Sequence, residues 1–158
     1  ASTPTIDKEI KSKYESIWEQ AASGNFNSWT ETANGSVALI IILDQFPLNM
    51  FRSEVKSFKT ESMAIEVALN AINNGFDEEM DNEKLLFLFM PLMHSENIEH
   101  QNLQVYLFDK YNFNLDFSKH HRDLIKKFGR FPHRNEILGR MSTMEELDYL
   151  LSDNAFRG

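Results

Sequence analysis

Residues 117–135 constrain the fold more than any other part of the chain. Apolar side chains and one histidine recur there at helical spacing, so they share one face of a predicted helix; they are Phe117, His121, Leu124, Ile125 and Phe128. Gly129 can take the left-handed backbone conformation that closes a helix, and Pro132 suits the first turn of another. The sequence therefore predicts two helices joined by a tight corner.

The same region holds the densest positive charge of the chain. Residues 119–135 contain six Lys or Arg and one acid, a local charge of +5, whereas the whole chain carries −8. One basic corner on an acidic protein concentrates positive potential, which attracts anions. We predict that an anionic small molecule or an acidic peptide binds at Arg130, His133 and Arg134. The alternative for Lys126 and Lys127 is that they only form a solvated helix face.

Composition limits the classes of function. The 158 residues include no cysteine, which excludes disulfides, cysteine-ligated zinc and thiol nucleophiles. The length predicts one domain, 1–158. The longest apolar runs, 37–43 and 85–93, are far shorter than the roughly 20 residues that span a bilayer. We therefore expect a cytoplasmic protein without a membrane partner, and the acidic balance argues against nucleic acid as a partner.

Sequence motifs for nucleotide or metal chemistry are absent. The chain has no glycine-rich dinucleotide loop, no P-loop and no nucleophile elbow, and no two histidines have the spacing of a zinc-binding helix. We therefore expect neither a cofactor nor a metal.

Helical patterns cover most of the chain and no strand pair is apparent. The predicted helices are approximately 7–22, 36–52, 60–73, 82–94, 99–111, 117–128, 132–139 and 142–151. Short loops favour antiparallel neighbours, so the fold class is all-α, with six to eight helices in antiparallel pairs.

Several local signals set the predicted helix ends. We expect Asp7 and Thr60 to cap helices and Pro47 to kink one. Ser142 and Glu145 have the spacing of a capping box. Residues 25–35 are predicted to be a loop that two aromatics, Phe26 and Trp29, pin to the core, and residues 153–158 are predicted to fray.

Asp44 is the most informative acid. It shares a helical face with apolar residues of 37–41, which predicts that it is buried. A buried carboxylate needs a cationic or hydrogen-bonding partner, and we predict Arg52 or an Arg or His of 121–134. Such a pair either fixes helix packing or provides a general base or ligand anchor. Histidines raise the same choice between core packing and acid–base chemistry, so the catalytic candidates are Asp44, His94, His121 and His133.

Three stretches, 43–52, 91–96 and 121–135, together resemble a mostly bacterial domain-of-unknown-function family, number 924. The resemblance extends from about residue 6 to 151. It implies an all-helical, right-handed array similar to tetratricopeptide-repeat proteins, and it implies no activity. Leu48 departs from the family pattern, which usually has Arg there. The positions that match the family's polar motifs are Asp44, Gln45, Asn49, Arg52, His94, Ser95, Glu96, His121, Arg122, Arg130, His133, Arg134 and Asn135.

We expect these three stretches to meet in space, which leaves three functions open. A binding module would use the basic corner for an anion. Its candidate ligand-binding residues are Asp44, Gln45, Asn49, Arg52, His94, Glu96, Arg122, Arg130, His133, Arg134 and Asn135. An enzyme would use the acid–base candidates on an anionic substrate. In the third alternative, the polar motifs only lock the fold. The charge pattern favours the binding module.

Overall fold

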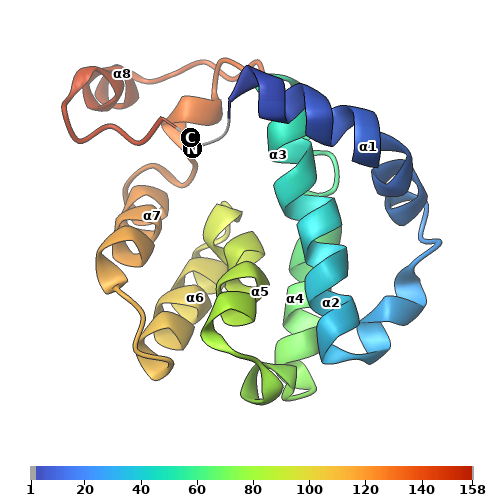
Figure 1. Cartoon of the computed structure of the whole chain (residues 1–158). Coiled ribbons are helices and arrows are strands. Elements are labelled where there is room, and N and C mark those ends of the chain that lie inside the picture. Colours follow the sequence, from blue (N-terminus) through green and yellow to red (C-terminus); the bar gives the residue numbers. More distant parts are fainter. Residues whose placement is uncertain (1–2, 158) are drawn as a thin grey trace. The chain divides into compact units, whose positions relative to one another are not determined.

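The structure, a computed structural model, describes residues 3–157, and every regular element in that range is helical (Figure 1). The all-α prediction is therefore confirmed. The chain divides into two compact units between His94 and Ser95. Both the single domain and the likeness to repeat arrays stay predictions.

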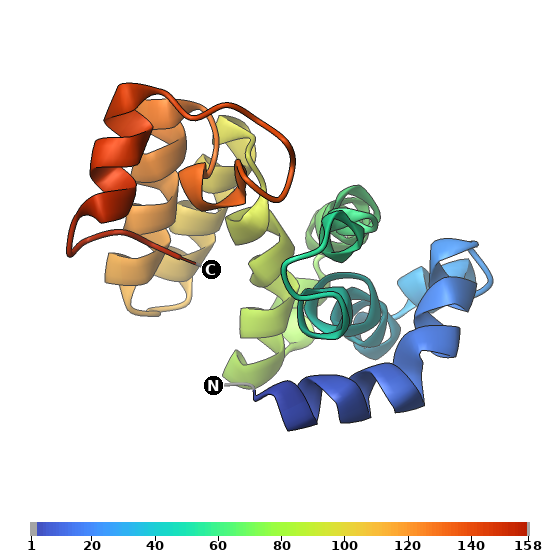
Figure 2. The ribbon, with the colours of Figure 1, turned by 90° about the horizontal axis from the view of Figure 1, so that it is seen from above.

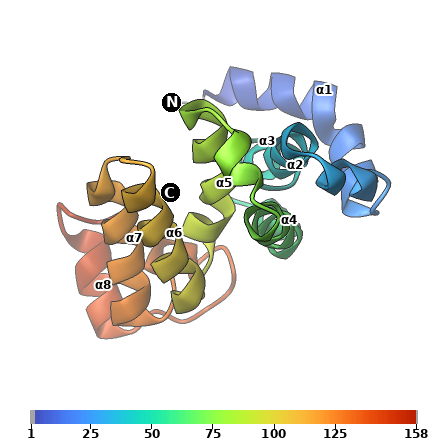
Figure 3. The same ribbon diagram turned by 90° about the horizontal axis from the view of Figure 1, so that it is seen from below.

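The N-terminal unit is a bundle around one long helical rod. Its helices are α1 (Pro4–Ala22), α2 (Ala33–Ile40), α3 (Phe46–Met50), α4 (Glu61–Asn73) and α5 (Asn82–His94). α1 packs against α3, and α2 packs against α4 and α5 (Figure 3). The largest fully buried side chains of this unit include Trp18, Leu39, Ile40, Leu43, Phe51 and Phe89.

A π turn joins α2 and α3 into that rod. In this turn, Ile41–Gln45, the N–H of Phe46 donates to the carbonyl of Ile41, five residues back. The predicted irregularity at Pro47 therefore begins before the proline. Pro47 has no N–H, so it cannot donate to the carbonyl of Leu43 as a regular helix requires. The hydroxyl of Thr60 donates to that carbonyl instead, at 2.5 Å.

Thr60 connects three elements through this one hydroxyl. Its Oγ1 also accepts a hydrogen bond from the indole Nε1 of Trp18 in α1, at 3.0 Å, in a buried position. Thr60 stands at the N-cap position of α4, but its side chain makes no capping bond, so the prediction of a side-chain cap was wrong. The hydroxyl of Thr60 bonds instead to the carbonyl of Leu43, which Pro47 leaves without a helical donor.

We expect Thr60→Val to lower the free energy of unfolding by about 2 kcal/mol, because two buried polar groups lose their partner. Urea denaturation measures this change. Thr60→Ser is the matched control, since it keeps the hydroxyl and should cost less than about 1 kcal/mol. An equal loss in both variants would show that the methyl group matters and the hydrogen bonds do not.

Two local predictions for the N-terminal unit were wrong. Thr3 caps α1 by accepting from the N–H of Ile6, whereas Asp7 lies in the first turn. Residues 27–31 form a 3-10 helix, and Trp29 stacks on Phe26 while remaining exposed, so it does not pin the segment to the core. Trp29 instead packs on the half-buried ring of Phe26.

The C-terminal unit contains α6 (Ile98–Lys110), α7 (Leu115–Phe128) and α8 (Met144–Leu151). α6 packs against α7, and Figure 2 shows α8 (red) beside α7 (orange). Gly129 closes α7 with a φ of 71°, as its position in the sequence predicts. The apolar core consists of Leu124, Ile125 and Phe131, and the partly buried side chains packed against it are Ile98, Phe128, Tyr149 and Phe156.

Three predictions for the C-terminal unit need correction. Pro132–Arg134 is a short 3-10 turn and no α-helix follows it to 139. The capping box is formed by Thr143 and Glu146, one position later than predicted. The end of the chain does not fray at Phe156, whose ring packs against His121 with centroids 4.5 Å apart.

Candidate functional site

Asp44 is buried and pairs with His94. The Oδ1 atom of Asp44 lies 2.9 Å from the Nδ1 atom of His94, and its Oδ2 atom accepts a hydrogen bond from Gln45. Burial is therefore confirmed, but the pairing with Arg52 was wrong, because Arg52 donates to Asp7 at 2.8 Å and to Asn49 at 3.3 Å. Pairing of Asp44 with residues 121–134 stays a prediction.

This pair has the elements of an acid–base site. A buried carboxylate on Nδ1 fixes the tautomer and the orientation of a histidine ring, as in hydrolytic enzymes. The side chain of His94 is 21% exposed, while that of Asp44 is 3% exposed. Asp44 also lies within the π turn, and such turns occur frequently at functional sites.

In the C-terminal unit, Glu96 ties the corner after α7 to the loop before α8. Its carboxylate accepts from the backbone N–H of Phe131 at 2.7 Å and from two nitrogens of Arg140 at 2.7 and 2.9 Å. Burial alone would raise the pKa of Glu96, but the bonds from Arg140 and Phe131 outweigh it and lower that pKa. Arg140 was not among the predicted site residues, because it lies outside the three stretches.

Glu146 forms a second carboxylate centre. It is buried in α8 and accepts from Arg130 at 2.7 and 2.9 Å, from the N–H of Thr143 at 2.8 Å and from Asn135 at 3.2 Å. The hydrogen bond from Arg130 is the main reason that the pKa of Glu146 falls to about 2. The charge of Arg130, predicted to meet an anionic ligand, is therefore matched inside the protein.

The other cationic candidates of this unit lie in three different settings. Arg134 is buried, with its guanidinium 4.9 Å from the centroid of the Phe131 ring. Arg122 pairs with exposed Asp123 at 3.0 Å. His121 is buried among aromatic rings and donates from Nδ1 to the carbonyl of Phe117 at 2.9 Å. The position of His121 is therefore that of a core residue.

His133 is a neutral, half-buried histidine. Burial, followed by the charges of Arg134 and His121, lowers its pKa to about 4. Its Nδ1 atom is buried and has no hydrogen-bond partner among the described residues. His133 therefore presents an uncharged ring at neutral pH and adds no positive charge to the corner.

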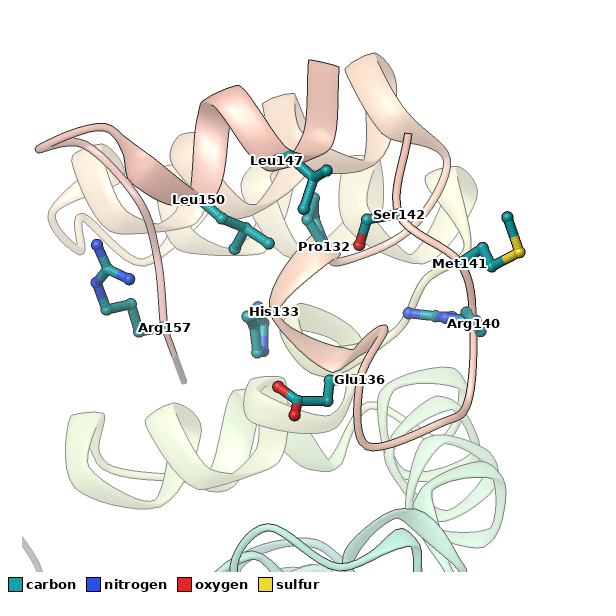
Figure 4. A pocket seen from close by; sticks show the side chains of 9 residues that line it. All are labelled: Pro132, His133, Glu136, Arg140, Met141, Ser142, Leu147, Leu150 and Arg157. Atoms are coloured by element: carbon teal, nitrogen blue, oxygen red, sulfur yellow. The ribbon is translucent and has the colours of Figure 1, made fainter. Parts of the chain in front are cut away.

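A pocket of about 630 Å³ opens beside these networks (Figure 4). In the close-up, Leu147 and Leu150 of α8 face it from one side, and His133 and Glu136 lie across from them. Arg157 stands at one end. The full lining is Pro132, His133, Glu136, Arg140, Met141, Ser142, Leu147, Leu150 and Arg157.

A family model and a solved structure both match this chain. The model of a family described as "Bacterial protein of unknown function (DUF924)" matches residues 1–154. The chain belongs to the DUF924 family. A solved structure, that of the protein of unknown function ATU0120 from Agrobacterium tumefaciens, is 33% identical to this chain. The match covers 96% of this chain and 86% of that chain, with a TM-score of 0.90. A comparison with curated proteins finds no match.

The family resemblance expected from the three stretches is thereby confirmed. The structure also shows which stretches contact each other within each unit. The middle stretch of this DUF924 chain is divided at the boundary between the units. Its His94 contacts Asp44 of the first stretch, and its Glu96 contacts Phe131 of the third. A meeting of all three stretches stays a prediction.

The described part of this DUF924 chain contains neither a candidate metal site nor a candidate membrane span. Among residues 3–157, no group of three or more acids and histidines has the geometry to hold a metal ion. Within the same residues, no helix is both long and apolar enough to cross a membrane.

Proposed function

We propose that this chain is a binding module whose C-terminal unit holds a small organic carboxylate. The pocket beside α8 is the observation that supports it. Its volume of about 630 Å³ lies in the range of about 300–1,000 Å³ that ligand sites occupy. Its walls combine apolar side chains with a few polar groups, which is the usual composition of a small-molecule site.

Arg157 is the cation best placed for the carboxylate. It lines the pocket, is exposed and forms no ion pair within the described part of the chain. Arg140 also lines the pocket, but its guanidinium is bound to Glu96 on two nitrogens. In this proposal the apolar body of the ligand packs on Leu147 and Leu150. The anion prediction is thus kept, with its centre moved from Arg130 to Arg157.

Thermal denaturation with straight-chain monocarboxylates tests the proposal. A ligand that binds the native state raises the melting temperature. The rise should grow with chain length, because each added methylene contributes roughly 0.8 kcal/mol when buried. Arg157→Gln and Leu150→Asp should abolish the rise, whereas Lys126→Gln, an exposed change on α7, should leave it intact. Equal responses in all variants would show a general salt effect and no site.

The Asp44–His94 pair supports a second candidate, an enzyme that transfers protons through His94. The distance of 2.9 Å and the burial of Asp44 are the observations that favour it. A panel of chromogenic esters and amides tests it. Turnover that disappears in both His94→Asn and Asp44→Asn would support the enzyme, and turnover that persists in either variant would reject it.

A further inference from the structure

Large apolar side chains lie exposed in a row along α8. Met144, Leu147 and Leu151 are three and four positions apart, so they share one face of the helix. Met144 is 74% exposed and Leu151 is 85% exposed, and Met141, just before the helix, is 90% exposed. We call Met144, Leu147 and Leu151 the α8 row. Contiguous exposed apolar surface of this kind marks a site of interaction.

The row is not the face by which α8 is held in its own unit. That role belongs to Glu146, which is buried on Arg130, and to Tyr149, whose ring packs on Phe128 with centroids 5.4 Å apart. The helix is therefore anchored on one side and presents a second apolar face outward. Because the anchoring does not use the row, its side chains are open to another molecule.

Acidic side chains border the row. Asp148 lies on α8 four residues after Met144 and three before Leu151, and Asp153 follows the end of the helix. Glu136 lines the adjoining pocket. None of these three acids forms an ion pair within residues 3–157, whereas Arg157 is the single exposed cation of the pocket. Asp148 and Asp153 therefore give the border of the row a negative charge.

We infer that the α8 row docks an amphipathic helix of a partner protein, one whose apolar face is bordered by Lys or Arg. A helix fits because its own side chains at three- and four-residue spacing match a row with that spacing. Basic borders fit because they complement Asp148 and Asp153, and complementary charge selects the partner. A second copy of this chain would bring like charges together, and an anionic lipid surface would be repelled in the same way.

This surface goes beyond the proposed carboxylate site. Leu147 belongs to both surfaces, but Met144 and Leu151 are absent from the lining of the pocket, so replacement of these two should leave carboxylate binding unchanged. The two proposals can therefore fail independently. A carboxylate response that survives in Met144→Ser/Leu151→Ser while peptide binding is lost would separate them.

Selection from a phage library of helical peptides, performed on the full chain, tests the inference. The library varies the apolar face and its two borders, with acidic, neutral and basic residues equally represented. Enriched peptides should carry Leu, Phe or Met at three- and four-residue spacing with Lys or Arg beside them. Synthetic copies should bind about tenfold more weakly to Met144→Ser/Leu151→Ser and to Asp148→Lys, as expected when anchor contacts are lost.

Val55→Ser is the matched control, because Val55 is an exposed apolar residue of the N-terminal unit. All variants change exposed side chains, and circular dichroism checks that each is folded. The inference would be overturned if no peptide were enriched or if the enriched peptides had acidic or neutral borders. It would also be overturned if the peptides bound the double variant as tightly as the wild type. It would also be overturned if sedimentation showed a dimer that Leu151→Ser dissolves, or if the row bound vesicles of phosphatidylglycerol.

Discussion

Glu146→Ala is expected to lower the free energy of unfolding by about 4 kcal/mol, because it removes one partner of a buried ion pair. Arg130 would lose two hydrogen bonds, Asn135 one and the N-terminus of α8 its capping carboxylate. Denaturant unfolding followed by circular dichroism measures the change. The loss should extend beyond α8, since Asn135 belongs to the corner after α7.

Glu145→Ala provides a control at the neighbouring position. Glu145 pairs with Lys127 at 3.1 Å, but both side chains are more than half exposed, so the expected cost is below about 1 kcal/mol. The two variants remove the same chemical group from successive residues of one helix. If their costs were equal, burial of Glu146 would contribute nothing and the explanation given for this network would be wrong.

The same carboxylate makes stability depend on acid. The folded-state pKa of Glu146 is about 2, below its ordinary value of 4.5, so its contribution is complete above pH 4.5 and is lost as the pH falls toward 2. The difference in stability between the wild type and Glu146→Gln should shrink across that window. His133 lowers stability over a higher pH range. Its folded-state pKa of about 4 lies below the ordinary 6.5, so the unfolded chain takes up the proton first and stability falls as the pH drops from 6.5 toward 4.

Asp44→Ala should cost about 3 kcal/mol, again because a buried polar pair is broken. His94 would lose the carboxylate on Nδ1, and Gln45 would lose its acceptor. A double-mutant cycle with Asp44→Ala and His94→Ala measures the coupling between the two side chains. A coupling near zero would mean that the 2.9 Å contact stabilises nothing and that Asp44 acts only through Gln45.

Local patterns predicted the elements that local forces decide. The helix ending at Phe128 follows from its apolar spacing and from Gly129, whose φ of 71° few other residues adopt. The burial of Asp44 followed from its apolar neighbours in the same way. Neither inference needed a contact between distant parts of the chain.

Distant contacts decided what the sequence left open. Ser142 with Glu145 and Thr143 with Glu146 are equally good capping boxes, and the ion pair of Glu146 with Arg130, 16 residues away, selects the second. The partner of Asp44 lies 50 residues away and that of Glu96, Arg140, lies 44 residues away. Spacing along a chain cannot find such partners, so the candidate residues were identified better than their pairings.

The π turn at Ile41–Gln45 carries a consequence for comparing related chains. A bond across five residues accommodates one residue more than the four-residue bond of an α-helix, so the turn equals a single-residue insertion in the rod. Deleting one residue of 41–43 should therefore restore α-helical hydrogen bonding in this segment, apart from the donor that Pro47 lacks, and rotate everything before it by about 100° relative to Asp44. A one-residue gap at this place in a relative would mark a chain in which the contact with His94 is rebuilt or lost.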